Sequence, residues 1–190
     1  MTDFIGLYDN VAPENMCQKI IDYFEENKIR QVRGRYYNHE KIAVDRTVKA
    51  STDIYMDFSE ENVCNTIMAN ILNRYTQIYQ DTFRSTWLID NWSVDLQYNI
   101  QRYNPGEGYY KVHCEDCGPE TNRVMAWTLY LNTVTDGGQT KFVEYDRSID
   151  AVMGRLVIFP AYWTHSHHGV PSPSQTKYIV TGWYIYDNQE

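Results

Sequence analysis

The sequence contains few cysteines, no long apolar run and no basic leader. Its four cysteines (Cys17, Cys64, Cys114 and Cys117) are too few and too scattered for a disulfide scaffold. No stretch approaches the ~20 consecutive apolar residues that a membrane-spanning helix requires. The N-terminus also lacks the basic segment followed by an apolar segment that is typical of a secretory signal. We therefore expect a soluble cytoplasmic protein with reduced thiols and no membrane partner.

An excess of basic residues is also missing. The chain has 17 Lys and Arg against 25 Asp and Glu, which gives a formal net charge of −8. Binding to a nucleic-acid backbone requires a concentrated cationic surface, and no run of basic residues supplies one. This balance argues against a nucleic-acid partner.

The sequence has no internal repeat, low-complexity tract or linker, so we expect one domain over residues 1–190. Its first part, about 1–90, is predicted to be a helical support, and about 91–187 to be a β-rich core. One helix is predicted after Pro13 and a second after Ser59, where Ser59 would cap it. The apolar positions of both recur at helical spacing: Met16, Ile20, Tyr23 and Phe24 in the first, and Val63, Ile67, Ile71, Tyr75 and Ile78 in the second.

The segment between these helices, Arg30 to Thr52, is polar and basic. It is expected to be a solvated connection that ends in a short strand, or alternatively a loop that faces the substrate.

The second half consists of short β-rich runs separated by turn residues. Strands are predicted at Ser93–Tyr103, Tyr109–His113, Val124–Leu131, Thr140–Tyr145, Arg155–Phe159 and Lys177–Tyr186. Turn signals such as Asp136-Gly137-Gly138 lie between them. The pattern predicts a mainly β (α+β) fold, a sandwich or jelly roll, with the helices packed on one outer face.

Four of the five histidines lie in this half, and one of them is part of a His-x-Glu tripeptide. If His113 and Glu115 belong to a strand, both side chains project from the same face. One histidine from a later strand would complete a two-histidine, one-carboxylate site, which leaves metal positions open and suits Fe(II). A polar strand edge without metal is the simpler alternative. A zinc site built on Cys114 and Cys117 is another alternative.

Five blocks of sequence resemble the Fe(II)/2-oxoglutarate-dependent dioxygenase superfamily, specifically its prolyl 4-hydroxylase-like branch. The resemblance covers roughly residues 97–186, and the blocks occur in the family's order. They are Tyr103 to Glu115 with its Pro-Gly turn, Tyr130-Leu131-Asn132, Gly137 to Phe142, Phe159-Pro160, and His167-x-Gly-x-Pro171 followed by Lys177 and Trp183. The resemblance implies a double-stranded β-helix (jelly roll) and a hydroxylase.

The resemblance also implies site residues and cofactors. His113, Glu115 and His167 would be the catalytic metal ligands, and Tyr103, Tyr130 and Lys177 would bind the co-substrate. The implied cofactors are Fe(2+) and 2-oxoglutarate, with O2 as co-substrate and ascorbate as a candidate reductant. Lys177 lies ten positions after His167, which favours His167 as the distal ligand, whereas counting from Phe159-Pro160 favours His165. Arg123 and Trp183 fit the pattern as structural or supporting residues.

The resemblance suggests a peptidyl proline as substrate, with release of succinate and CO2. A free amino acid or another small metabolite is the alternative substrate, and a non-catalytic jelly-roll metal-binding module is the alternative function. Four aromatic residues, Tyr109, Trp127, Tyr162 and Trp163, are predicted to form a dry wall around the site. Arg33 and Arg35 of the basic loop are predicted to attract an acidic peptide.

Overall fold

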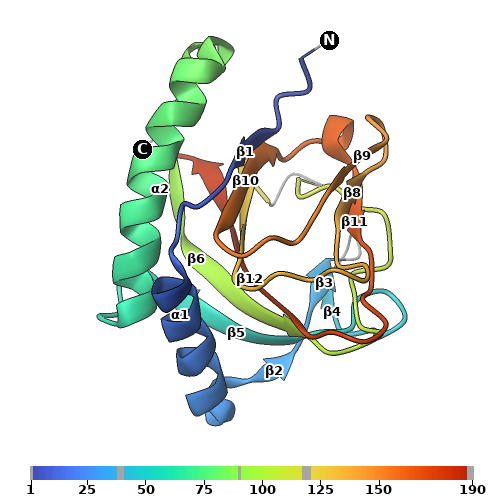
Figure 1. Ribbon diagram of the computed structural model, residues 1–190. Coiled ribbons are helices and arrows are strands. Elements are labelled where there is room, and N and C mark those ends of the chain that lie inside the picture. The colour runs from blue at the N-terminus through green and yellow to red at the C-terminus, as the bar shows by residue number, and fades with distance from the viewer. Residues whose placement is uncertain (1, 38–40, 90, 117–120, 188–190) are drawn as a thin grey trace.

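A computed structural model describes residues 2–37, 41–89, 91–116 and 121–187 (Figure 1). The helices in these ranges are α1 (Glu14–Glu26) and α2 (Val63–Thr82). The strands are β1 (Gly6–Tyr8), β2 (Val32–Arg33), β3 (Tyr36–Tyr37), β4 (Ile42–Ala43), β5 (Thr52–Asp57), β6 (Trp92–Tyr103), β7 (Arg123–Tyr130), β8 (Thr140–Phe142), β9 (Arg147–Ile149), β10 (Arg155–Pro160), β11 (His167–Gly169) and β12 (Lys177–Tyr186). His39 and Cys117 lie outside the described residues.

Two antiparallel sheets form the body of the molecule. The major sheet has the strand order β1-β10-β7-β12-β6-β5-β2, and the minor sheet has the order β11-β8-β9. A buried cluster that includes Phe142 and Ile149 of the minor sheet and Ala126 and Ile179 of the major sheet packs between them. The β3–β4 hairpin lies beside these sheets (Figure 1). The predicted mainly β jelly roll is confirmed.

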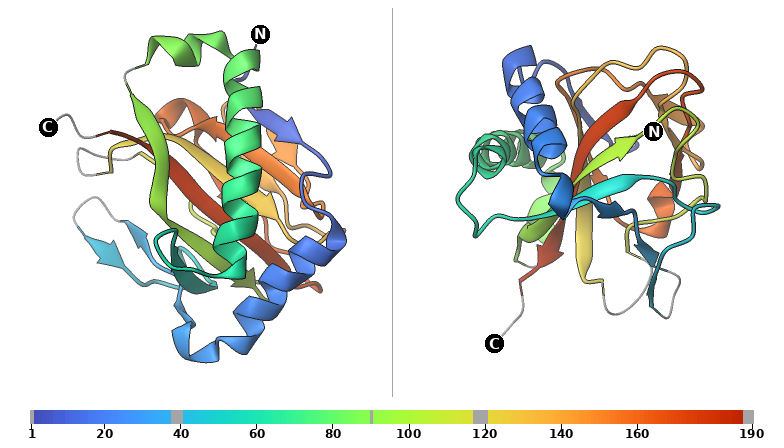
Figure 2. Two further views of the ribbon diagram at one scale, coloured as in Figure 1. Left: turned by 90° about the vertical axis from the view of Figure 1, so that its left-hand side faces the viewer. Right: turned by 90° about the horizontal axis from the view of Figure 1, so that it is seen from below.

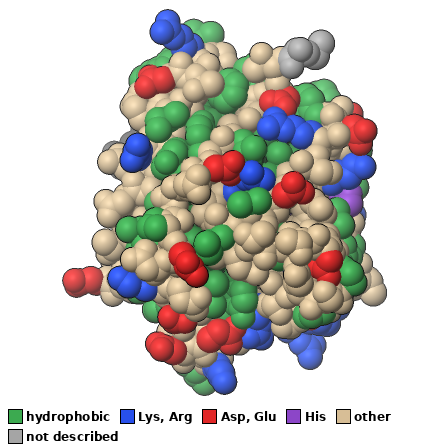
Figure 3. Space-filling view, viewed as in Figure 1, with side chains coloured by type: hydrophobic (Ala, Val, Ile, Leu, Met, Phe, Trp, Pro, Cys, Tyr) green, Lys and Arg blue, Asp and Glu red, His purple; other side chains and the backbone are tan. Residues whose placement is uncertain are grey.

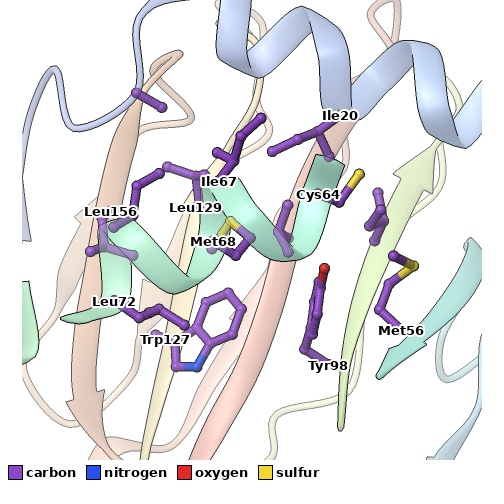
Figure 4. Close-up of a cluster of buried hydrophobic side chains, with 14 of the residues drawn as sticks. Ile20, Met56, Cys64, Ile67, Met68, Leu72, Tyr98, Trp127, Leu129 and Leu156 are labelled. Atoms are coloured by element: carbon purple, nitrogen blue, oxygen red, sulfur yellow. The ribbon is translucent and has the colours of Figure 1, made fainter. Parts of the chain in front are cut away.

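Both helices cover the outer face of the major sheet, as predicted (Figure 2). Strand alternation explains this arrangement, because Tyr98 and Ile100 of β6 face the helices while Asn99 and Gln101 face the other side. Tyr98 and Trp127 are almost completely buried beneath α2 (Figure 4). The larger of the two hydrophobic cores therefore lies between helices and sheet, and the opposite face of the sheet is left for the site.

The start of α2 differs from the prediction. Asn62 is the N-cap, and its side chain accepts a hydrogen bond from the backbone N–H of Asn65. Ser59 instead lies in the preceding turn, where its backbone N–H donates to Asp57 Oδ1. Both residue types favour helix starts, so the local sequence alone did not separate them.

The first 90 residues are less helical than predicted, because β1, β5 and β2 join the major sheet. Strand β5 pairs with β6 along its whole length, with Asp53 opposite Gln101 and Tyr55 opposite Asn99. Its two aspartates weaken the strand signal, and pairing with β6 provides the stability that propensity does not.

In the second half, β6, β7, β10 and β12 are confirmed to within about one residue, and β8 is shorter than predicted. The predicted strand Tyr109–His113 is wrong. Its ends make only isolated bridges, from Tyr109 to Lys49 and from His113 to His167.

Acidic and basic side chains are interspersed over the face seen in Figure 3. Among the described helices, none is long and apolar enough to cross a membrane.

Candidate active site

Two neighbouring side chains, His113 and Glu115, converge with His167, which lies much later in the chain. His113 Nε2 lies 3.7 Å from Glu115 Oε1, and His167 Nε2 lies 3.3 Å from the same oxygen. The three potential ligand atoms all lie within 4.8 Å of one another. Two imidazoles and one carboxylate at this separation are a donor set that suits Fe(II).

Backbone pairing brings the two histidines together. The N–H of His113 donates to the carbonyl of His167 at 3.0 Å, and the N–H of His167 donates to the carbonyl of His113 at 2.8 Å. Each ring also places Nδ1 2.9 Å from a backbone carbonyl, that of Lys111 or His165. With a metal bound, an Nδ1–H that donates to this carbonyl would leave Nε2 of each ring as the ligand atom.

Glu115 reaches this point by a route that differs from the prediction. The backbone from His113 to Glu115 is irregular, so the argument from strand alternation was wrong. Instead, the N–H of Glu115 donates to the carbonyl of Ala161, at the end of β10, at 2.9 Å. The backbone of Glu115 is therefore held by a segment that lies later in the same chain.

The second carboxylate oxygen of Glu115 is held by Trp183 of β12. Trp183 Nε1 donates to Glu115 Oε2 at 2.8 Å. The guanidinium of Arg123 stacks 3.6 Å from the centre of the Trp183 ring and donates from Nη1 to the Glu115 carbonyl at 2.9 Å. Oε1 thus faces the two histidines while Oε2 is fixed on the other side.

The electrostatics favour a charged Glu115 carboxylate and a neutral His113 imidazole. Burial alone would raise the pKa of Glu115, but hydrogen bonds from His113 and His167 and their charge hold it well below its ordinary value. The pKa of His113 is lowered, first by burial and then by repulsion from His167. These protonation states are the ones that bind a cation.

His165 lies outside this cluster. Its Nε2 is 2.7 Å from the carbonyl of Asp3, and its Nδ1 is 2.9 Å from the hydroxyl of Thr164. The ring is buried and ties the N-terminal segment to the body. Of the two histidines that sequence spacing left open, the structure brings only His167 next to His113 and Glu115.

A cavity of about 260 Å³ adjoins the three side chains. Lys177, at the start of β12, lines it and is only 5% exposed. Its Nζ donates to the carbonyl of Gly138 at 3.0 Å and lies 4.9 Å from the ring centre of Tyr103. Burial lowers the pKa of Lys177 to about 8. Within the described chain, no carboxylate pairs with this ammonium group.

The two predicted tyrosines occupy different positions. Tyr103 lines the cavity, and its hydroxyl donates to Gln101 Oε1 at 2.7 Å. Tyr130 lies behind the wall, where its hydroxyl donates at 2.7 Å to the hydroxyl of Thr140, which does line the cavity. Contact between Tyr130 and a co-substrate stays a prediction.

The predicted aromatic wall is correct only for Tyr109, which lines the cavity and stacks 3.6 Å from the His113 ring. Trp127 packs in the core under α2 (Figure 4). The Tyr162 hydroxyl pairs with that of Tyr186 away from the cavity lining, and Trp163 is 74% exposed. Sequence alone did not reveal which sheet face each aromatic residue occupies.

Sequence reasoning missed a polar sector of the cavity wall formed by β5 and β6. Lys49 and Asp53 form a buried ion pair at 3.0 Å, and Gln101 Nε2 donates to the same Asp53 oxygen at 3.4 Å. Asn99 lines the cavity beside them. The signal was present in β6, where Asn99 and Gln101 alternate with Tyr98 and Ile100 and mark a polar inner face.

Comparisons with known proteins agree with this arrangement. Residues 98–185 match the sequence profile of the 2OG-Fe(II) oxygenase superfamily. The matched segment, just under half of the chain, is an oxygenase domain of that superfamily. It is therefore a 2-oxoglutarate-dependent oxygenase, and the matched residues include all three convergent side chains and Lys177.

Solved prolyl hydroxylases share the fold of this oxygenase. A Pseudomonas putida prolyl-4-hydroxylase is 18% identical with a TM-score of 0.71, over 98% of this chain and 95% of that one. A viral collagen prolyl hydroxylase from Paramecium Bursaria Chlorella virus-1, in a 2OG complex, is 18% identical with a TM-score of 0.67, over 97% of each chain. A Trichoplax adhaerens prolyl hydroxylase, in complex with a hypoxia inducible factor peptide fragment, is 16% identical with a TM-score of 0.76, over 97% and 84%. No curated protein matches by sequence.

The residues present fit the two groups that the superfamily requires. The two imidazoles and one carboxylate suit Fe(II) and leave coordination positions open. Lys177 is a buried cation without a carboxylate among the described residues, which is costly unless a ligand supplies the negative charge. The distal carboxylate of 2-oxoglutarate is such a group.

Proposed function

We propose that this oxygenase is a hydroxylase in which His113, Glu115 and His167 bind Fe(II) and Lys177 binds the distal carboxylate of 2-oxoglutarate. The observation that carries the proposal is that Lys177, a buried ammonium group with no carboxylate partner among the described residues, lines the same cavity as the three convergent ligands. A structural metal site would not require this second, unpaired charge.

When bound, Fe(II) and 2-oxoglutarate supply oxidative decarboxylation by O2, which yields succinate and CO2 and places one oxygen atom on a substrate C–H bond. Ascorbate is a candidate reductant that keeps the metal ferrous between turnovers.

The protein residues bind and orient. Lys177 and the Tyr103 ring fix one end of the co-substrate, and Thr140, held by Tyr130, offers a hydroxyl on the same wall. Trp183 holds Glu115 Oε2, so that Oε1 remains directed at the metal position. Tyr109 covers one face of His113 and excludes water from it.

The proposed substrate is a prolyl residue in a peptide. The fold shared with prolyl hydroxylases supports this choice, since one of them is described with a bound peptide fragment. Part of the cavity lining comes from the β3–β4 hairpin, through Tyr36, Tyr37 and Ile42, which provides an aromatic and apolar edge for an extended ligand. A free amino acid remains the alternative substrate.

The test is product analysis with Fe(II), 2-oxoglutarate, O2 and ascorbate. We expect succinate and a substrate 16 Da heavier in equal amounts, and loss of both in Glu115→Ala. Arg33→Gln is the matched control, because Arg33 is exposed on β2 and does not line the cavity. If the protein binds metal but forms no succinate with any peptide or amino acid, the non-catalytic metal-binding module is the better description.

A further inference from the structure

One wall of the cavity carries a polar side chain, that of Asn99, without a hydrogen-bond partner among the described residues. Asn99 of β6 is only 7% exposed and lines the cavity, and within the described chain no hydrogen bond reaches its side-chain amide. An amide has two donors and an acceptor. The Asn99 amide is therefore available to a ligand that enters the cavity.

The neighbours of Asn99 extend this wall toward the opening. Tyr55 of β5 is paired with Asn99 across the sheet, and Thr181 of β12 is paired with it on the other side. The guanidinium of Arg35 stacks 5.3 Å from the Tyr55 ring centre. Arg35, Tyr55, Asn99 and Thr181 therefore form one continuous surface of the cavity lining, from an exposed cation to a buried amide.

Arg35 differs from the other cations of the cavity in its contacts. The charged lining residues are Arg35, Lys49, Arg123, Lys177 and Glu115, so four cations face one carboxylate in a protein with net charge −8. Lys49 is paired with Asp53, and Arg123 contacts Glu115. Lys177 is assigned above to the co-substrate. Arg35 has no carboxylate partner in the described chain.

Three other arginines of the basic loop do not line the cavity. Arg30 pairs with Glu60 at 3.1 Å, and Arg46 pairs with Glu107. Arg33 is exposed on β2. Of the two arginines predicted to attract an acidic peptide, only Arg35 lies where a substrate of this site would pass.

Resting on the proposed function, we propose that the substrate is an acidic peptide whose carboxylate side chain pairs with Arg35 and whose backbone amide, next to the oxidised residue, pairs with Asn99. A peptide unit offers both a donor and an acceptor, which matches a side-chain amide in two hydrogen bonds. A carboxylate matches the planar guanidinium.

The test measures binding to the anaerobic Fe(II)·2-oxoglutarate complex of the full chain. Three of the probes are acetylated hexapeptides that differ only in the residue next to a central proline, which is Glu, Gln or Lys. The other two probes are free glutamate and free proline. We expect the Glu peptide to bind about twofold to fivefold more tightly than the Gln peptide at low salt, and the Lys peptide to bind most weakly. Arg35→Gln should remove this order, and Arg33→Gln should keep it.

Asn99→Leu is the second variant. Because the Asn99 amide bonds to no other described residue, the melting temperature should stay the same or rise, while all three peptides bind about threefold to tenfold more weakly. Affinity for 2-oxoglutarate should not change. A lower melting temperature with unchanged peptide binding would make Asn99 a structural residue and overturn its assignment.

The remaining outcomes separate the two proposals. Equal binding of the Glu and Lys peptides, or equal effects of Arg33→Gln and Arg35→Gln, would overturn the inference alone. If free glutamate binds through Arg35 and the peptides do not bind, this result would support recognition of a carboxylate by Arg35 and overturn the proposal that the substrate is a peptide. If the wild-type protein forms no complex with Fe(II) and 2-oxoglutarate, the proposed function and this inference fail together.

Discussion

Lys177 should reduce the stability of the protein without 2-oxoglutarate, and Lys177→Met should remove this cost. Burial lowers the pKa of Lys177 from 10.5 to about 8, and this difference corresponds to about 3 kcal/mol at pH 7. Lys177→Met also loses the hydrogen bond to Gly138, worth about 1 kcal/mol. We therefore expect the variant to be more stable by about 2 kcal/mol at pH 7.

The sign of the pH dependence follows from the same pKa. Between pH 8 and 10.5 the unfolded chain binds more protons at Lys177 than the folded chain does. As the pH increases through this range, the stability of the wild-type protein therefore rises relative to that of Lys177→Met. By pH 10 the cost of burying the Lys177 ammonium falls to about 1 kcal/mol. The hydrogen bond to Gly138 offsets this cost, so Lys177→Met should no longer be more stable than the wild-type protein. Urea denaturation of both proteins at pH 7 and pH 10 measures this difference.

The matched control is Lys141→Met, because Lys141 is 41% exposed and pairs with Asp146 on the surface. Its effect should be within about 0.5 kcal/mol at both pH values. Adding 2-oxoglutarate with Mn(II), a redox-stable substitute for Fe(II), should stabilise the wild-type protein and not Lys177→Met. Destabilisation by Lys177→Met at pH 7, or an advantage that persists at pH 10, would refute the reasoning.

Three further variants test the surroundings of the site. Trp183→Phe removes the hydrogen bond to Glu115 Oε2 and should weaken Fe(II) binding about tenfold to hundredfold in an anaerobic titration. In a Glu115→Asp background, Trp183→Phe should not weaken Fe(II) binding further. If the two losses of affinity add, Trp183 acts on the site by another route than Glu115. Gly34→Ala places a methyl group 2.0 Å from Ser51 Oγ and should lower stability by about 1–3 kcal/mol, seen as a lower melting temperature. An unchanged melting temperature would contradict the close packing. His165→Ala should lower the unfolding free energy by about 1–3 kcal/mol through loss of its buried packing and its contact with Asp3, yet keep metal affinity; loss of the metal would contradict its structural role.

Strands rich in β-branched and aromatic residues could be predicted from the sequence. The bounds of β12 match the prediction, and β6 and β7 begin within one residue of it. Strand β5 could not be found in this way, since its two aspartates weaken the strand signal and its pairing with β6 is a long-range contact.

The candidate site was predictable in its residues and not in its geometry. The family resemblance identified His113, Glu115 and His167, but local periodicity gave the wrong reason for their convergence. Glu115 is positioned by the carbonyl of Ala161, 46 residues later in the chain. Long-range contacts of this kind leave no local pattern. The single-domain prediction and the roles of the site residues stay predictions.

The most direct test of the account is an anaerobic Fe(II) titration in the presence of 2-oxoglutarate, followed by the visible absorption of the complex. We expect the band in the wild-type protein and in His165→Ala, and no band in His113→Ala or His167→Ala. A band that persists in His167→Ala and disappears in His165→Ala would contradict the ligand assignment.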